Sequence, residues 1–483
     1  MKILFTHSYF LHFDPKQVAH AQPYPPLGTI LAAAVLREKG LEVCLFDVMF
    51  AHQAEEIKPV LEREKPDVLV VYDDGFNYLT KMCLSNMREA AFHMQGFAKQ
   101  MGCKVIVTSS DAADHYEKYL NKGADYVIIG EAENTLLELC NQLKADALSH
   151  ENIPGLAYLK NGQVIRNAKR AVSKNLDEFP LPAWDLIDFT PYRKVWMDHH
   201  GYYSVNLATT RGCPYHCNWC AKPMYGNAYH MRSVEQVLKE IKLLKSLIDF
   251  THIWFCDDIF GLKRSWVSDF AKQVSKEKLT FRYKIQSRAD LLVQEKYVED
   301  LAASGCDEVW MGAESGSQKI LDAMDKGTTV QQIKLARELL FKHRIKSAFF
   351  IQYGYLGETM EDIRMTLDLI RDCSPDDIGI SVSYPLPGTS FYEKVKHELV
   401  QKTNWTDSDD LALMFKNTYS PAFYKILHRY THSVYRKNNA LRKLREPVSF
   451  SVKSKALVSF CKHKLLQSIQ GLKLRKSQLI QQT

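Results

Sequence analysis

The 483-residue sequence predicts an α/β protein with an N-terminal doubly wound domain, an incomplete C-terminal barrel and a basic tail. Two observations support this prediction. Short, almost entirely apolar runs alternate with longer amphipathic stretches, first five times and then six times. The apolar runs have no polar face, which is typical of parallel sheets covered by helices on both sides. Hydrophobic residues make up 46% of the chain and charged residues 25%, which excludes a fibrous or wholly disordered protein.

The first alternation predicts a domain over residues 1–150. Its five strands begin near Lys2, Leu41, Pro66, Cys103 and Asp125. The segments between them, such as LGTILAAAVLREKG, have helical length and composition. Doubly wound, Rossmann-like domains bind ligands at the carboxyl ends of their strands. In this chain those ends carry THS, YDD, TSSDAAD and GEAENT.

Residues 151–200 are predicted to form a hairpin and a linker. The hairpin GLAYLKNGQVIRN has Asn161-Gly162 as its turn. Three prolines and the lack of a helical period in LDEFPLPAWDLIDFTPY indicate a linker that wraps around its neighbours instead of folding alone.

The second alternation, over residues 201–400, predicts six βα units of an incomplete TIM-type barrel. Its strands are YSVNLATT, THIWFCDD, FRYKIQSR, DEVWMGAES, IKSAFFIQYGY and DDIGISVSYPLPG. Barrels of this type build their active sites from the loops that follow the strands. The loop after the first strand carries Cys213, Cys217 and Cys220, so we expect a cofactor there.

The three cysteines are four and three residues apart and supply three ligands, so the fourth ligand of a metal site remains to be identified. Structural zinc prefers four Cys or His ligands, mostly in pairs. His216 could complete such a site, but a second pair is missing. An iron-sulfur cube bound by three thiolates keeps one iron free for a substrate or cosubstrate. We therefore favour a 4Fe-4S cluster and keep zinc as the alternative.

The C-x-x-x-C-x-x-C loop, with Trp219 before its last cysteine, resembles the radical S-adenosylmethionine (radical SAM) superfamily. The resemblance extends to about residue 400 and looks like the cobalamin-binding branch. Matching segments include PPLGTILAAAVLREKG, DYVIIGEAENTLLEL, TTRGCPYHCNWC, FCDDIFG, QSRADLL, GAESGSQKILDAMDKGTT and PLPGTSFYE. The resemblance implies a reduced cluster that cleaves S-adenosylmethionine to a 5′-deoxyadenosyl radical.

The resemblance also implies the site residues. It implies that the three cysteines bind the cluster and that the backbone at Trp219 contacts the adenine of S-adenosylmethionine. The residues implied to contact S-adenosylmethionine are Asp257, Asp258, Arg288, Glu314 and Ser315. Those implied to line a cobalamin site are Thr108, Ser109, Ser110, Gly130 and Glu131. The chain lacks the D-x-H-x-x-G motif, so we expect cobalamin to bind without a histidine ligand. No catalytic residue is implied.

We therefore expect a radical SAM enzyme that transfers a methyl group to carbon or performs a radical rearrangement or cyclisation. A small-molecule or lipid-like substrate and a reductant such as flavodoxin or ferredoxin would be its partners. One alternative is a methylthiotransferase, which would need further cluster cysteines, but Cys44, Cys83 and Cys103 do not stand at strand-end loops. A zinc-stapled basic nucleic-acid-binding protein is the non-enzymatic alternative.

The net charge of +7 is concentrated in the tail. From Arg429 onward there are thirteen Lys or Arg and one acid, Glu446. The predicted extension over residues 401–483 includes a basic helical pattern with Leu457, Phe460, Cys461, Leu465 and Ile469. It could contact an anionic membrane, bind nucleic acid or simply be solvated, and solvation is the commonest case. The amino terminus lacks the apolar region of a secretory signal, so we expect a cytoplasmic protein without a transmembrane helix.

Overall fold

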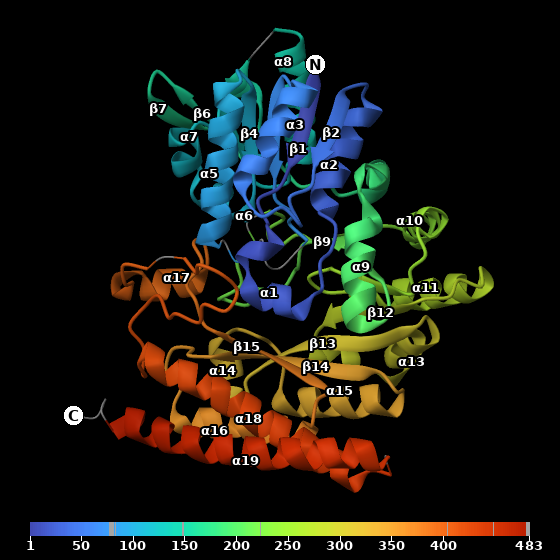
Figure 1. The fold of residues 1–483 in the computed structure, drawn as a ribbon, viewed down its shortest axis with the longest axis vertical. Coiled ribbons are helices and arrows are strands. Elements are labelled where there is room, and N and C mark those ends of the chain that lie inside the picture. The colour runs from blue at the N-terminus through green and yellow to red at the C-terminus, as the bar shows by residue number, and fades with distance from the viewer. Residues whose placement is uncertain are drawn as a thin grey trace.

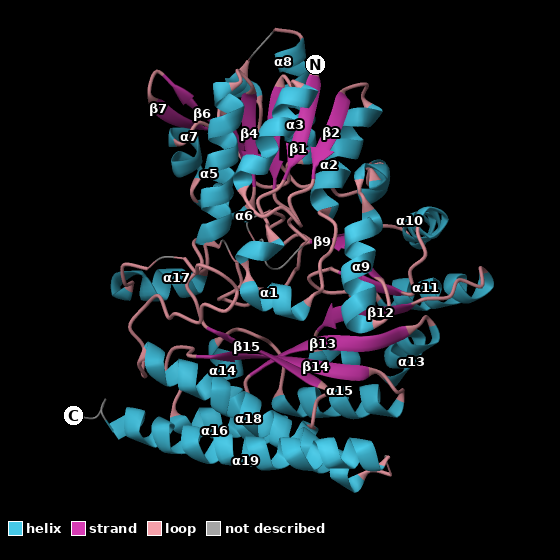
Figure 2. Cartoon of the chain, viewed as in Figure 1, coloured by secondary structure: helices cyan, strands magenta, loops and turns pink. Residues whose placement is uncertain are grey.

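The computed structural model describes residues 1–76, 82, 84–146, 149–222, 224–402, 404–447 and 449–479. Figure 1 shows the N-terminal sheet at one end of the molecule, the barrel strands in the middle and two long helices at the opposite end. Helices flank the strands of both sheets (Figure 2).

The N-terminal sheet has seven strands in the order β2-β1-β3-β4-β5-β6-β7. The five parallel strands are β1 (Lys2–Thr6), β2 (Glu42–Phe46), β3 (Val68–Tyr72), β4 (Lys104–Thr108) and β5 (Tyr126–Ile128). One face packs against α2 (Leu27–Glu38) and α8 (Glu133–Lys144). The other packs against α3 (Ile57–Glu64), α5 (Ser85–Gln100) and α7 (Tyr116–Asn121). This arrangement confirms the doubly wound prediction.

The predicted hairpin forms and extends this sheet. Strands β6 (Leu156–Lys160) and β7 (Gln163–Arg166) are antiparallel, and β6 pairs with β5. Asn161 and Gly162 have φ angles of 52° and 78°, as a two-residue turn of this kind requires. The hairpin therefore belongs to the first sheet, because β5 leaves an edge that β6 can cover.

The predicted linker contains a helix that the sequence pattern did not reveal. Helix α9 (Phe189–His200) begins after Asp188, whose carboxylate accepts a hydrogen bond from the Thr190 N–H. Its only buried residues are Tyr192 and Trp196, four positions apart, so the apolar stripe is too narrow to show as a period.

The second sheet has six parallel strands in the order β8-β11-β12-β13-β14-β15 and forms an incomplete barrel, as predicted. Its strands are β8 (Ser204–Leu207), β11 (His252–Phe255), β12 (Arg282–Ser287), β13 (Cys306–Glu314), β14 (Lys346–Tyr353) and β15 (Asp377–Val382). Its outer helices are α10 (Val234–Leu247), α11 (Arg264–Lys276), α12 (Ala289–Leu292), α13 (Glu295–Ala303), α14 (Gln318–Ala323), α15 (Val330–Lys342) and α16 (Met360–Cys373).

After the barrel come α17 (Ser390–Val395), α18 (Pro421–Arg445) and α19 (Phe450–Leu479). Helix α18 packs on α16 and β15, and α19 packs on α18 (Figure 1). The segment before α18 returns to the first domain, where the Ser408 hydroxyl donates to the Asp14 carboxylate over 2.8 Å and the Ser85 N–H donates to the Trp405 carbonyl over 2.8 Å. Within the described residues, no helix combines the length and the apolar character needed to cross a bilayer.

Candidate active site

A cavity of about 1190 Å³ lies between the N-terminal sheet and the barrel and continues into the barrel interior. Its walls include Cys213, Cys217 and Cys220 from the loop after β8. Short helix α1 (Pro15–His20) and helices α18 and α19 close its sides. A volume of this size exceeds that of a typical small-molecule pocket, so it has room for more than one ligand.

The cysteine loop is held in a tight fold. It starts at β9 (Thr210–Arg211), which pairs with β10 (His230–Met231). Gly212 has φ of 79°, and a Cβ there would lie 2.2 Å from the Ala228 carbonyl oxygen, so only glycine fits. The Lys222 ammonium donates to the Cys213 carbonyl over 2.9 Å. All three cysteines of the loop line one cavity.

The three cysteines are half-buried free thiols. Burial raises the pKa of the Cys220 thiol to about 12 and raises that of Cys213, so both are protonated without a metal. His216 is exposed and does not line the cavity, so it is not placed as a fourth zinc ligand. Cys44 lies in β2 and Cys103 is buried against Pro66, while Cys83 lies outside the described residues.

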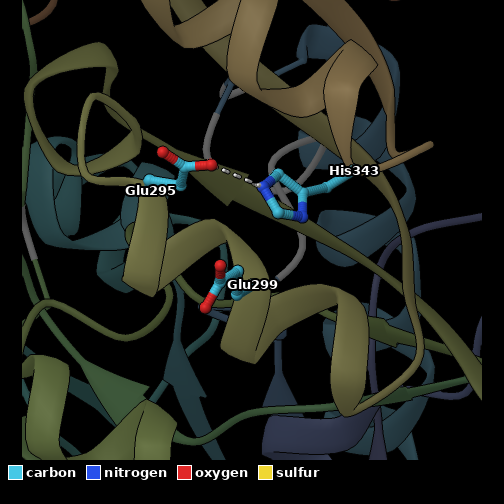
Figure 3. A group of neighbouring side chains, drawn as sticks. All are labelled: Glu295, Glu299 and His343. Atoms are coloured by element: carbon cyan, nitrogen blue, oxygen red, sulfur yellow. Dashed lines mark ion pairs between the residues drawn. The ribbon is translucent and has the colours of Figure 1, made fainter.

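A different group, Glu295, Glu299 and His343, is the only one among the described residues whose three possible ligand atoms lie within 4.8 Å of one another. Figure 3 shows Glu295 and Glu299 on α13 and His343 just after α15, on the outside of the barrel. His343 Nε2 lies 3.7 Å from Glu295, which also pairs with Lys342. Both glutamates are exposed, so ordinary surface ion pairing accounts for the group.

Arg288, at the end of β12, places a positive charge beside the cysteine loop. Its guanidinium stacks on the Tyr215 ring at 3.5 Å from the ring centroid, and its Nη1 lies 4.0 Å from Cys217 Sγ. A second nitrogen donates to the Lys326 carbonyl over 2.9 Å, and Asp290 pairs with Nε at 3.0 Å. These contacts fix the side chain against the cavity wall.

Glu314 and Lys326 form a buried ion pair at the end of β13. Their charged atoms are 2.8 Å apart, and both side chains line the cavity. A register shift after Gly312 and a φ of 56° at Glu314 turn the carboxylate into this position. A Cβ on Gly312 would lie 2.6 Å from Lys326 Nζ, so glycine gives the pair its room. Burial lowers the pKa of Lys326, but Glu314 outweighs this and the pKa is raised.

Three other residues expected to contact the cosubstrate differ in position. Asp258 lines the cavity. Asp257 lies behind the wall, where its carboxylate accepts hydrogen bonds from the backbone of Thr209 and Thr210 at 2.7 and 2.8 Å. Burial raises the pKa of Asp257 to about 6 although these bonds oppose the shift. Ser315 is also outside the cavity lining and bonds Thr366.

Trp219 lines the cavity beside the cysteines. Its indole N–H is buried and has no hydrogen-bond partner in the part of the chain that the structure describes. A buried donor without a partner is costly, so this group is suited to an acceptor on a bound ligand.

The residues expected to hold cobalamin stand at the carboxyl ends of β4 and β5, and of these only Ser110 lines the cavity. Ser109 caps α6 (Ser110–Asp114) by accepting from the Ala112 N–H. Thr108 is buried, with no partner for its hydroxyl among the described residues, and Gly130 has φ of 92°. Glu131 pairs with Arg211 instead of facing the cavity.

Arg211 joins the two sheets through a buried ion triad that sequence reasoning missed. Its guanidinium lies 2.5 Å from Glu131 and 2.6 Å from Glu133, which follow β5. The ring of Phe179, from the linker, lies 4.5 Å away. Because Arg211 immediately precedes Gly212, the triad fixes the cysteine loop to the N-terminal domain.

The barrel strands and α18 add polar groups to the cavity wall. The Trp310 indole N–H donates to Glu308 over 2.7 Å, and Lys284 lies 3.4 Å from the Gln22 side-chain oxygen. Burial lowers the pKa of His428 to about 4 and that of His432 to about 3, so both imidazoles are neutral at pH 7. These groups can orient a polar substrate by hydrogen bonding.

Comparisons with known proteins show which family and which relatives the chain is similar to. The radical SAM superfamily matches residues 207–370. An uncharacterized methyltransferase of Pyrococcus horikoshii is 27% identical over 439 residues, covering 87% of this chain and 89% of the relative. The anaerobic magnesium-protoporphyrin IX monomethyl ester cyclase of Rubrivivax gelatinosus is 24% identical over 405 residues, covering 82% and 70%.

Among solved structures, the cobalamin-dependent S-adenosylmethionine radical enzyme OxsB, with aqua-cobalamin bound, superposes with a TM-score of 0.76. Sequence identity is 17%, and the match covers 97% of this chain and 72% of OxsB. The likeness extends over the N-terminal sheet, the barrel and most of the C-terminal helices. Residues 207–370 are therefore a radical SAM domain, and the chain is a radical SAM enzyme with the fold of the cobalamin-dependent branch.

Proposed function

We propose that the chain binds a 4Fe-4S cluster at Cys213, Cys217 and Cys220 and uses S-adenosylmethionine and cobalamin to methylate a carbon atom of its substrate. The observation that supports this most directly is the placement of three thiols of one loop on the wall of one large cavity between the two sheets. The donor set fits a cluster, because three thiolates leave one iron open for a cosubstrate. When bound, the cluster supplies the electron that cleaves the sulfonium.

The residues around the cysteines have complementary roles in this proposal. Arg288 offsets the negative charge of the thiolate ligands from 4.0 Å. Asp258 and Glu314 present carboxylates on the cavity wall that suit the ammonium group of the cosubstrate, and Glu314 would share its charge between that group and Lys326. The unpartnered Trp219 N–H and the fixed loop backbone offer hydrogen bonds to its adenine.

The loops of the N-terminal domain suit a broad, flat ligand. Tyr9, Leu11, Met49, Gly75 and Ser110 line the cavity opposite the cysteines. His20 of α1 also lines the cavity, but the chain has no D-x-H-x-x-G motif, so we propose that cobalamin binds without a protein ligand to cobalt. We infer that Ser110 approaches the corrin, whereas Glu131 acts through the ion triad.

Similarity to the methyltransferase of P. horikoshii supports methyl transfer as the first candidate reaction. Similarity to the cyclase of R. gelatinosus supports ring closure as the second. The substrate would be a small or lipid-like molecule held in the part of the cavity lined by the barrel strands and α18. An external one-electron reductant, such as flavodoxin or ferredoxin, would be required because reductive cleavage consumes an electron.

The test is anaerobic reconstitution of the full chain. We expect about four irons per chain, 5′-deoxyadenosine after dithionite reduction, and base-off absorption of bound cobalamin. Replacing the three cysteines by alanine should remove iron, while Cys461→Ala, on the exposed face of α19, serves as the matched control. Stoichiometric zinc would overturn the cluster, and S-adenosylmethionine cleavage without cobalamin uptake would favour rearrangement over methyl transfer.

A further inference from the structure

Helix α19 is the outermost layer at the C-terminal end of the molecule (Figure 1). Its inner face packs against the body of the protein through Ala456, His463 and Leu474, which are 5%, 8% and 6% exposed. At 3.6 residues per turn these three positions lie on one side of the helix. The opposite side therefore faces solvent.

That outward side is apolar. The large hydrophobic side chains on it are Phe450 (88% exposed), Leu457 (53%), Val458 (69%), Leu465 (64%), Ile469 (42%) and Leu472 (68%). Their successive spacings of seven, one, seven, four and three place them within one arc of roughly 120° along the helix, which we call the α19 stripe. They make six of the sixteen exposed large hydrophobic residues of the described chain, so the stripe is a concentration and not scatter.

Basic side chains border the stripe on both sides. Lys453, Lys464 and Arg475 recur every eleven residues along one border. Along the other border are Lys455, Lys462 and Lys473. Phe450–Leu479 contains no Asp or Glu, and none of its described lysines or arginines forms an ion pair. The outer face therefore combines an exposed apolar stripe with two uncompensated positive rows.

We propose that the outer face of α19 docks on an anionic lipid surface. A lipid headgroup layer neutralises the basic rows while the acyl region takes up the apolar side chains, so this partner uses both features. Nucleic acid would engage the lysines but leave the leucines in water. A second copy of the chain would cover the stripes but bring four positive rows together. The proposal rests on this surface and is independent of the proposed activity.

The docking face lies directly behind the cavity. His463, Leu466 and Gln470, on the inner side of α19, line the cavity wall. A docked helix would therefore hold the barrel interior one helix thickness from the lipid. This position suits a substrate that is delivered from the membrane surface.

The experiment measures sedimentation of the full chain with vesicles of phosphatidylcholine alone or with about 30% phosphatidylglycerol. We expect binding only to the anionic vesicles. Leu465→Glu combined with Leu472→Glu should weaken partitioning at least about tenfold, and neutralising Lys455, Lys462 and Lys473 to Gln should do the same. Leu247→Glu, on α10 and 46% exposed, is the matched control and should bind like the unmodified chain.

Thermal unfolding and iron content should be unchanged in all variants, because the substituted side chains are exposed. Equal sedimentation with both vesicle types, or equal loss in the Leu247 control, would overturn the proposal. So would concentration-dependent dimerisation that the Leu465 and Leu472 substitutions abolish in light scattering, or binding to duplex DNA that persists in the presence of anionic vesicles.

Discussion

Replacing Arg211 by methionine tests whether the buried ion triad holds the cysteine loop to the N-terminal domain. The guanidinium is 4% exposed, and the side chains of Glu131 and Glu133 are 2% and 1% exposed. Methionine keeps most of the volume but leaves two carboxylates buried without a cation. Removing one partner of a buried pair costs about 3–5 kcal/mol. The lost contact with the Phe179 ring adds roughly 1–2 kcal/mol.

We therefore expect Arg211→Met to lower the thermal unfolding midpoint by roughly 4–7 °C and to reduce the iron retained after reconstitution. A triple variant, Arg211→Met with Glu131→Gln and Glu133→Gln, tests the role of the triad more sharply. This variant removes all three charges, so it should recover much of the lost stability. Differential scanning calorimetry and iron analysis would measure both effects.

Arg211→Lys is the matched control, because it keeps one positive charge but loses the forked contact to two carboxylates. Its stability should fall between those of the unmodified chain and the methionine variant. A destabilisation of less than about 1 kcal/mol in Arg211→Met, or a triple variant less stable than the single one, would refute the proposed role of the triad.

Three further predictions concern single residues. Glu314→Gln should weaken binding of S-adenosylhomocysteine about tenfold or more in calorimetric titration, because a charged hydrogen bond is lost; unchanged affinity would remove Glu314 from the site. Burial raises the pKa of Glu358 from its usual 4.5 to about 8, so the folded state retains a proton that the unfolded state releases near pH 4.5. The free energy of unfolding should therefore fall as pH rises from about 4.5 to 8. At pH 9 the free energy of unfolding of Glu358→Gln should exceed that of the unmodified chain by roughly 3–5 kcal/mol. Melting temperatures of the two proteins that change in parallel from pH 5 to 9 would contradict this. Ser110→Trp should block cobalamin uptake, followed by absorption, without changing iron content; retained uptake would place the corrin elsewhere.

The fold could be predicted because both sheets consist of apolar strands whose pattern is local. The strands VLVVY (Val68–Tyr72) and HIWF (His252–Phe255) are wholly buried, and continuous apolar runs of this length indicate parallel sheets. The placement of β6 beside β5 could not be read in the same way. A hairpin shows its own turn in the sequence but not the edge to which it pairs.

That the three cysteines line one cavity could be predicted, because their spacing places them in a single loop. Lys326 was missed because a lysine in a loop is usually solvated, and its pairing depends on the register shift after Gly312. Asp257 and Glu131 stand at strand ends, but their side chains turn away from the cavity. Sequence position fixes the strand end to which a residue belongs and leaves open the direction of its side chain.

The segment that carries Trp405 and Ser408 has a kinetic consequence. It returns from the barrel to the first domain, so together with the linker and Arg211 the two sheets are joined at three separate places. Hinge motion between the two domains would require that they be joined at one narrow connection, and the described residues join them at several places instead. Substrate and product should therefore exchange through local loop motions, and hydrogen exchange should report slow, cooperative protection on both sides of the junction while turnover proceeds.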